Sequence, residues 1–104
     1  MNDIKKNIEN TINKLQEAIE LFYQQNDGEA FKKFEISIAN IDVLIKNIGK
    51  YEIEKDISIL DKDKIVNILT EALEALETKD NVLMADILQY DFIEYLNEVL
   101  EKLD

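Results

Sequence analysis

The chemistry open to this chain rests on its carboxylates, because the sequence contains no cysteine, no histidine and no arginine. Without cysteine there are no disulfides, no thiol catalysis and no thiolate metal sites. Without histidine the chain lacks the commonest general base and the commonest metal ligand. All 12 basic residues are lysine, which disfavours the bidentate phosphate clamps that arginine forms. Any catalytic or metal site would therefore be built from the 23 aspartates and glutamates.

Several glutamates stand about one helical turn apart, so that both acids of a pair would project from the same helix face: Glu17 with Glu20, Glu71 with Glu74, Glu74 with Glu77, and Glu98 with Glu101. All-α nucleotide pyrophosphatases build magnesium sites from such pairs, and magnesium prefers oxygen ligands. This spacing is common in so acidic a chain, however, and the pairs fall mostly on predicted polar faces. We therefore predict that the chain is not an enzyme and binds no metal or cofactor. A magnesium-dependent nucleotide hydrolase is the alternative.

A stretch from residue 83 to residue 92 combines apolar side chains with an acid and a tyrosine. Asp86 and Tyr90 are four residues apart and would be neighbours on a helix, on a strip bordered by Leu83, Ile87 and Ile93. Interaction hot spots often combine an aromatic anchor with a charge in this way. These five residues are therefore the predicted partner-binding site.

Asp86 also has a structural interpretation, which the pattern favours. An acid among apolar neighbours usually has a hydrogen-bond partner, because burying an unpaired polar group costs free energy. The donor would be Tyr90 on the same helix, a lysine, or a tyrosine across the bundle, either Tyr23 or Tyr51.

The net charge of −11 is concentrated in the second half of the chain. Residues 1–50 carry seven lysines and eight acids, whereas residues 51–104 carry five lysines and fifteen acids. The electrostatic field of this excess negative charge either keeps a small domain soluble or steers a basic partner toward it. Nucleic acid and anionic membrane surfaces are disfavoured, because both require clustered positive charge. The predicted sources of the field are Glu71, Glu74, Glu77, Glu94, Glu98 and Glu101.

Apolar residues recur at spacings of three and four, the period of amphipathic helices, in stripes over residues 4–22, 31–48, 65–76 and 88–103. The chain has no proline and only two glycines, so long helices meet little resistance. We predict an all-α fold, an antiparallel four-helix bundle built from two helical hairpins. The single predicted domain, residues 1–104, divides into hairpin 1–48, crossover 49–62 and hairpin 63–104.

The ends of these helices are predicted from glycines and acids. Gly28 would supply a positive φ in the first turn, and Gly49 would terminate the second helix. The alternative is that the second helix continues through Gly49 into the crossover. Three N-caps are predicted from side-chain type: Asp27, Asp80, and either Asp61 or Asp63.

The fourth helix is apolar over an unusually large part of its girth, since residues 83–100 add a second stripe beside the first. Such a helix is either central in the bundle or covered by a partner. A shift of 54 residues also aligns the two hairpins, setting Phe22 on Leu76 and the turn near Asp27 on the turn near Asn81. This weak repeat indicates two hairpins of similar geometry.

The stretch around Asp86, together with the Asn26-Asp27-Gly28 turn before an apolar helix, resembles small uncharacterised helical proteins of low-GC Gram-positive bacteria. In size, acidity and bundle form the chain is also similar to flagellar export chaperones, by analogy of fold alone. With no apolar leader and no run long enough to span a bilayer, a cytoplasmic location is expected. The predicted function is non-enzymatic binding of a protein partner, as a small adaptor or chaperone-like protein. The alternative is a self-associating structural module, a homodimer closed by residues 83–100.

Overall fold

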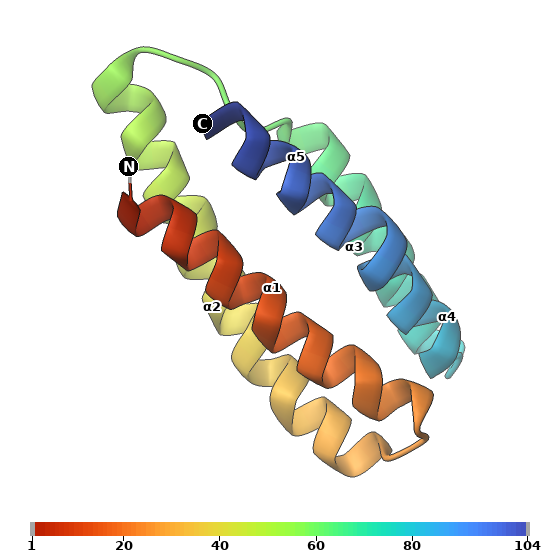
Figure 1. The fold of residues 1–104 in the computed structure, drawn as a ribbon. Coiled ribbons are helices and arrows are strands. Elements are labelled where there is room, and N and C mark those ends of the chain that lie inside the picture. Colours follow the sequence, from red (N-terminus) through yellow and green to blue (C-terminus); the bar gives the residue numbers. More distant parts are fainter. Residues whose placement is uncertain (1, 104) are drawn as a thin grey trace.

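The first half of the chain folds as an antiparallel helical hairpin. A computed structural model describes residues 2–103. In it, α1 (Asn2–Tyr23) is followed after a short turn by α2 (Asp27–Lys55), and the two helices pack along their length (Figure 1).

The second half forms a similar hairpin. Here α3 (Lys62–Glu77) turns into a rod made of α4 (Asn81–Ile87), the π-helical turn η1 (Leu88–Phe92) and α5 (Ile93–Leu103). The two hairpins pack face to face, which confirms the predicted all-α four-helix bundle.

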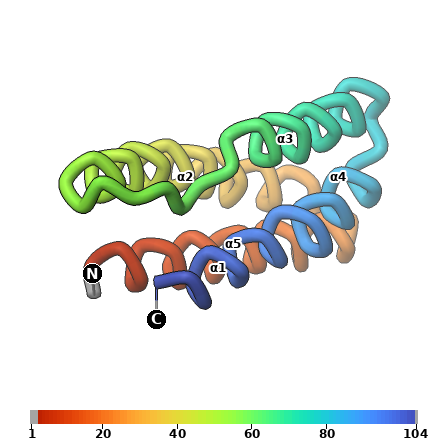
Figure 2. The backbone as a smooth tube through the Cα atoms, turned by 90° about the horizontal axis from the view of Figure 1, so that it is seen from above, coloured from red at the N-terminus to blue at the C-terminus, as the bar shows by residue number. Residues whose placement is uncertain are grey.

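α1 is the helix through which the two hairpins meet. It packs against α2 in its own hairpin and against α4, η1 and α5 in the other. Figure 2 shows α1 and α5 together in one layer, with α2 and α3 in the layer above. Within residues 2–103, no Cα of α2 lies within 8 Å of a Cα of α3, α4 or α5. The α2–α3 edge is therefore the loosely packed side of the bundle.

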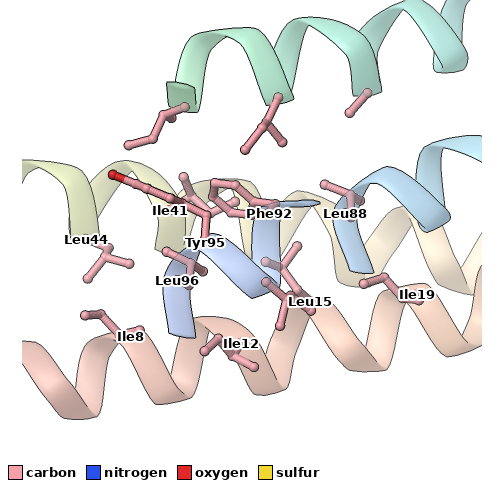
Figure 3. Packing of buried hydrophobic residues seen from close by; sticks show 14 of the residues in the cluster. Ile8, Ile12, Leu15, Ile19, Ile41, Leu44, Leu88, Phe92, Tyr95 and Leu96 are labelled. Carbon is pink, nitrogen blue, oxygen red and sulfur yellow. The ribbon is translucent and has the colours of Figure 1, made fainter. Parts of the chain in front are cut away.

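Apolar side chains from both hairpins form one continuous core. The stripe predicted for α1 is buried throughout: Ile4, Ile8, Ile12, Leu15, Ile19 and Phe22. Figure 3 shows four of these residues pointing toward the second hairpin, where they meet Leu88, Phe92, Tyr95 and Leu96. Burying a large aliphatic or aromatic side chain contributes about 1.5–3 kcal/mol, so this cluster is the main source of stability.

α1, α2 and α3 end in the same C-terminal motif. A residue with positive φ follows each helix: Gln25 (61°), Asp56 (54°) and Lys79 (62°). The next N–H in each case reaches back five residues to a carbonyl, from Asn26 to Leu21 (2.9 Å), Ile57 to Glu52 (3.1 Å) and Asp80 to Ala75 (2.9 Å). This is the bond pattern of the Schellman motif, which satisfies carbonyls that the helix leaves unpaired.

The two glycines occupy none of these left-handed positions, so both predictions that relied on them are wrong. Gly28 lies in the first turn of α2 and Gly49 lies inside that helix, and neither has a positive φ. The predicted cap at Asp27 is also wrong, because Asn26 is the N-cap residue of α2 and makes no side-chain capping bond. The left-handed positions that follow the helices are therefore occupied by Gln25, Asp56 and Lys79, and not by glycine.

Two predicted N-caps are confirmed. The carboxylate of Asp61 accepts from the backbone N–H of Lys64 (3.1 Å), and that of Asp80 accepts from the N–H of Leu83 (3.0 Å). Each satisfies one of the free donors at a helix start and typically stabilises a helix by about 1 kcal/mol.

The turns of the two hairpins correspond residue by residue under the 54-residue shift. Gln25 and Lys79, which adopt the left-handed conformation, are 54 residues apart, and so are the cap residues Asn26 and Asp80. The backbone bonds around the two turns correspond one to one. The weak sequence repeat is therefore also a repeat of local structure.

α2 passes through Gly49 and continues to Lys55, so the predicted crossover over residues 49–62 is wrong in its first seven positions. The extension positions Glu52, whose carboxylate accepts from the N–H groups of Ile59 (2.6 Å) and Leu60 (3.0 Å). At the far end of the crossover, the N–H of Asp61 donates to the buried Tyr95 hydroxyl (2.7 Å). Side chains on two helices thus hold the connection in place.

Replacing Gly49 with alanine should stabilise the fold. Nothing lies within 4 Å of a Cβ built at this position, and glycine inside a helix costs about 0.5–1 kcal/mol relative to alanine. Urea denaturation of the Gly49→Ala variant should therefore show a higher midpoint with an unchanged slope. A lower midpoint would mean that α2 ends before Gly49 in solution.

The fourth helix is not a uniform α-helix, because η1 interrupts it and the N–H of Ile93 bonds to the carbonyl of Leu88. The wider turn changes which side chains face inward afterwards. In the second apolar stripe, Ile93 and Leu96 are buried at 3% exposure each, Ile87 and Leu100 are half-buried, and Leu83 is exposed. The excess apolar surface predicted for residues 83–100 is therefore used in part to join the hairpins, and in part it stays at the surface.

Candidate protein-binding groove

Asp86 is held by a tyrosine from the first hairpin. The hydroxyl of Tyr23, at the end of α1, donates to Oδ1 of Asp86 over 2.6 Å. This is one of the partners expected from the sequence, and it ties α1 to α4 beside the two hairpin turns. Burial of the hydroxyl and then this bond raise the pKa of Tyr23 well above its ordinary value. The geometry supports the structural interpretation of Asp86.

The Tyr23–Asp86 bond should contribute stability that disappears in alkaline solution. Because the folded protein raises the pKa of Tyr23, the contribution is complete below the unfolded value of about 10 and is lost as the pH rises beyond it. Tyr23→Phe should cost about 1 kcal/mol at neutral pH, since the pair is partly exposed. The difference from wild type in urea denaturation should shrink above pH 10. A difference independent of pH would contradict this role.

The other residues of the predicted strip divide between surface and core. Leu83 and Tyr90 are 46% and 66% exposed, Ile87 is half-buried, and Ile93 is 3% exposed. Ile93 therefore belongs to the core and cannot contact a partner in this conformation. Leu83, Ile87 and Tyr90 remain as apolar groups at the surface, spaced by four and three residues along one helical rod.

These three side chains line two hollows between α3 and the opposite rod. One hollow, of about 340 Å³, contains Leu83 and Ile87 and is completed by Glu71, Glu74 and Ala75 of α3 and by Thr78, which follows that helix. The other, of about 200 Å³, contains Tyr90 and is completed by Lys64, Ile68, Asp91, Glu94, Tyr95 and Glu98. They follow one another along the same pair of helices, and we refer to them together as the outer groove.

The outer groove is strongly acidic. Its lining includes five exposed carboxylates, those of Glu71, Glu74, Asp91, Glu94 and Glu98. The one lysine in the lining, Lys64, lies 3.7 Å from Glu98 and 5.2 Å from the centroid of the Tyr95 ring. Four of the six glutamates predicted as sources of the acidic field thus border the predicted apolar strip.

The α3 wall of the groove is the part that sequence reasoning missed. The helical period identifies Ile68 and Ala75 as apolar positions of α3, but it does not show that their neighbours Glu71 and Thr78 face Leu83 and Ile87. The 54-residue repeat was the available signal, since it predicts that α3 packs against the fourth helix as α1 packs against α2.

The part of the chain that the structure describes offers no obvious metal centre or membrane span. No group of three or more acidic side chains is placed to hold a metal ion, and no helix is long and apolar enough to cross a membrane.

Comparison with known proteins connects this arrangement to a family. Residues 1–102 match the model of a family described as Domain of unknown function (DUF8042). The chain belongs to this family. The DUF8042 match spans both hairpins, so the groove and the hairpin behind it are parts of the same family domain. No curated protein and no solved structure matches the chain significantly.

Proposed function

We propose that this member of the DUF8042 family is a non-enzymatic protein-binding bundle, an adaptor or chaperone-like protein that binds its partner in the outer groove. The observation that carries the proposal is the combination of exposed apolar anchors and acids in one groove. An exposed tyrosine beside a hollow is typical of an interaction hot spot.

The charge of the groove defines the chemistry of the partner. Five carboxylates around Leu83, Ile87 and Tyr90 fit a basic segment whose apolar side chains fill the two hollows while its lysines or arginines meet the acids. An amphipathic helix provides this pattern, with anchors at positions i, i+3 or i+4, and i+7. The same charge weighs against the second candidate, a homodimer closed by this surface, because two chains of net charge −11 repel each other.

The analogy with flagellar export chaperones is compatible with this proposal, because such proteins are also small helical bundles that bind protein segments. The proposed bacterial origin rests on the composition of the chain, which is rich in lysine and isoleucine and contains no arginine.

The proposal can be tested with a designed peptide before a natural partner is identified. A fluorescent amphipathic helix of leucine and lysine should bind the protein, and a matched helix with glutamate in place of lysine should not. Leu83→Ala and Tyr90→Ala should each weaken binding about tenfold, equivalent to about 1.4 kcal/mol, in anisotropy titrations. Val43→Ala is the control, because Val43 is an apolar residue of α2 whose exposure, 53%, lies between those of Leu83 and Tyr90. Equal affinity for both peptides, or no effect of the groove variants, would reject the proposal.

A further inference from the structure

The two halves of the bundle are not equally covered, although their helices correspond. Under the 54-residue shift, Ile12 and Ile19 of α1 correspond to Val66 and Leu73 of α3. The α1 residues are 8% and 2% exposed, whereas the α3 residues are 59% and 53% exposed. The rod of the second hairpin covers Ile12 and Ile19 (Figure 3). The equivalent face of α3 has no such cover.

α2 also has apolar residues that are exposed although their counterparts in the second hairpin are buried. Ile38 is 49% exposed, whereas its counterpart Phe92 in the rod is 1% exposed. Ile38, Ile45 and Glu52 follow one another at seven-residue intervals and so lie on one side of α2. The Glu52 carboxylate bonds to Ile59 and Leu60, just before α3, so this side of α2 faces α3.

The uncovered side of α3 faces away from the outer groove. Lys64 and Glu71 line that groove, and Val66 and Leu73 are each two residues further on, which places them about 200° around the helix. The edge between α2 and α3 thus carries an apolar seam, which we define as Phe31, Ile38 and Ile45 of α2 with Val66, Leu69 and Leu73 of α3. Phe31, Ile45 and Leu69 are half-buried, and the other three are exposed.

Acids outnumber lysines along the margins of the seam. Glu35 and Asp42 are each one turn from Ile38, Asp63 is one turn before Val66, and Glu77 is one turn after Leu73; all four are exposed. The nearby lysines are Lys62 and Lys46, and Lys46 is paired with Asp42 at 3.0 Å. A helix that covers the seam must therefore be apolar on one face and basic on its flanks.

We propose that the seam is a second docking site, which receives a basic amphipathic helix of a partner protein in the place where the repeat lacks a covering helix. The site is distinct from the outer groove, and α3 is the wall that the two share. A chain with two such sites can hold two helices of one partner, or bridge two partners. A second copy of this chain is disfavoured as the occupant by its net charge of −11.

Isothermal titration with the leucine–lysine peptide tests this site separately from the groove. We expect two peptides per chain. Leu73→Lys should remove one of them, Tyr90→Ala should weaken the other about tenfold, and Val43→Lys on the opposite flank of α2 should leave both. Because Leu73 and Val43 are equally exposed, neither lysine should unfold the protein, and circular dichroism checks this. Leu73→Gln removes the apolar contact without adding a charge and should weaken the seam site about tenfold.

Three results would overturn the proposal. The first is one bound peptide that Tyr90→Ala weakens and Leu73→Lys does not affect, which would leave the groove function standing. The second is a stoichiometry of two that both seam variants preserve. The third is wild-type protein that sediments as a dimer and is made monomeric by Leu73→Lys, since a second copy would then be the occupant. If the protein binds one peptide and only the seam variants lose it, the proposed binding function of the outer groove is rejected and the seam remains a docking site.

Discussion

Reversing two charges beside Leu83 and Ile87 should abolish most of the binding of a basic helix to the outer groove. The double variant Glu71→Lys, Glu74→Lys replaces attraction by like-charge repulsion at the lining of the larger hollow. Both side chains are exposed, so the substitutions should change the stability of the fold little. We expect about a hundredfold loss of affinity for the leucine–lysine peptide at the outer groove, in anisotropy titrations at low salt on protein whose seam site is removed by Leu73→Lys. Added salt should reduce the difference, because it screens surface charges.

The repeat supplies a matched control for this variant. Glu17 and Glu20 of α1 are the counterparts of Glu71 and Glu74 under the 54-residue shift, so Glu17→Lys, Glu20→Lys changes the net charge equally on the same type of helix. These residues line neither hollow, and the control should lose only the small part of the affinity that depends on total charge. Equal losses in the two double variants would show that net charge, and not the groove, controls binding.

Removing the Phe22 ring should produce the largest loss of stability. Phe22 is fully buried, and its ring meets those of Phe31 and Phe34 edge-on, with centroids 5.0 and 6.1 Å apart. Truncation of a buried phenylalanine leaves a cavity and typically costs about 3–5 kcal/mol. The Phe22→Ala variant should therefore unfold at a much lower urea concentration than wild type.

The counterpart of Phe22 in the second hairpin should tolerate the same truncation better. Leu76 is only partly buried, so Leu76→Ala should cost about 1–2 kcal/mol. A smaller loss of stability in Leu76→Ala than in Phe22→Ala would show that the two hairpins, though similar in outline, contribute unequally to the core. Equal costs at the two positions would contradict the burial that distinguishes α1 from α3.

The helices and their inward faces could be predicted from the sequence because they depend on a local period. The stripe of α1 is buried as expected, and the two hairpin turns fall 54 residues apart as the repeat indicated. The end of α2 depends instead on a tertiary contact. α2 continues past Gly49 because the last turns place Glu52 where it can bind the backbone of the crossover. No local pattern around Gly49 contains that information.

The candidate site was also predicted only in part, because the helical period shows which residues share a face and does not show what packs against them. The period places Leu83, Ile87 and Tyr90 on one strip, and the hollows lie along it. It also placed Ile93 there, because a regular α-helix was assumed, whereas η1 and the packing against α1 bury that side chain. The sequence allowed Tyr90, Tyr23, Tyr51 or a lysine as the donor to Asp86, and the packing of the two hairpins brings Tyr23 to it.

Chemical-shift mapping of the leucine–lysine peptide on the isotope-labelled protein is the most direct test of the outer groove. On titration, the backbone amides of Leu83, Ile87, Tyr90 and Glu94, and of Glu71 and Thr78 across the groove, should shift together with one affinity. The Tyr90→Ala variant should weaken this set of shifts. If the peptide binds and these amides do not move, while resonances elsewhere in the bundle do, then the outer groove is not the binding site.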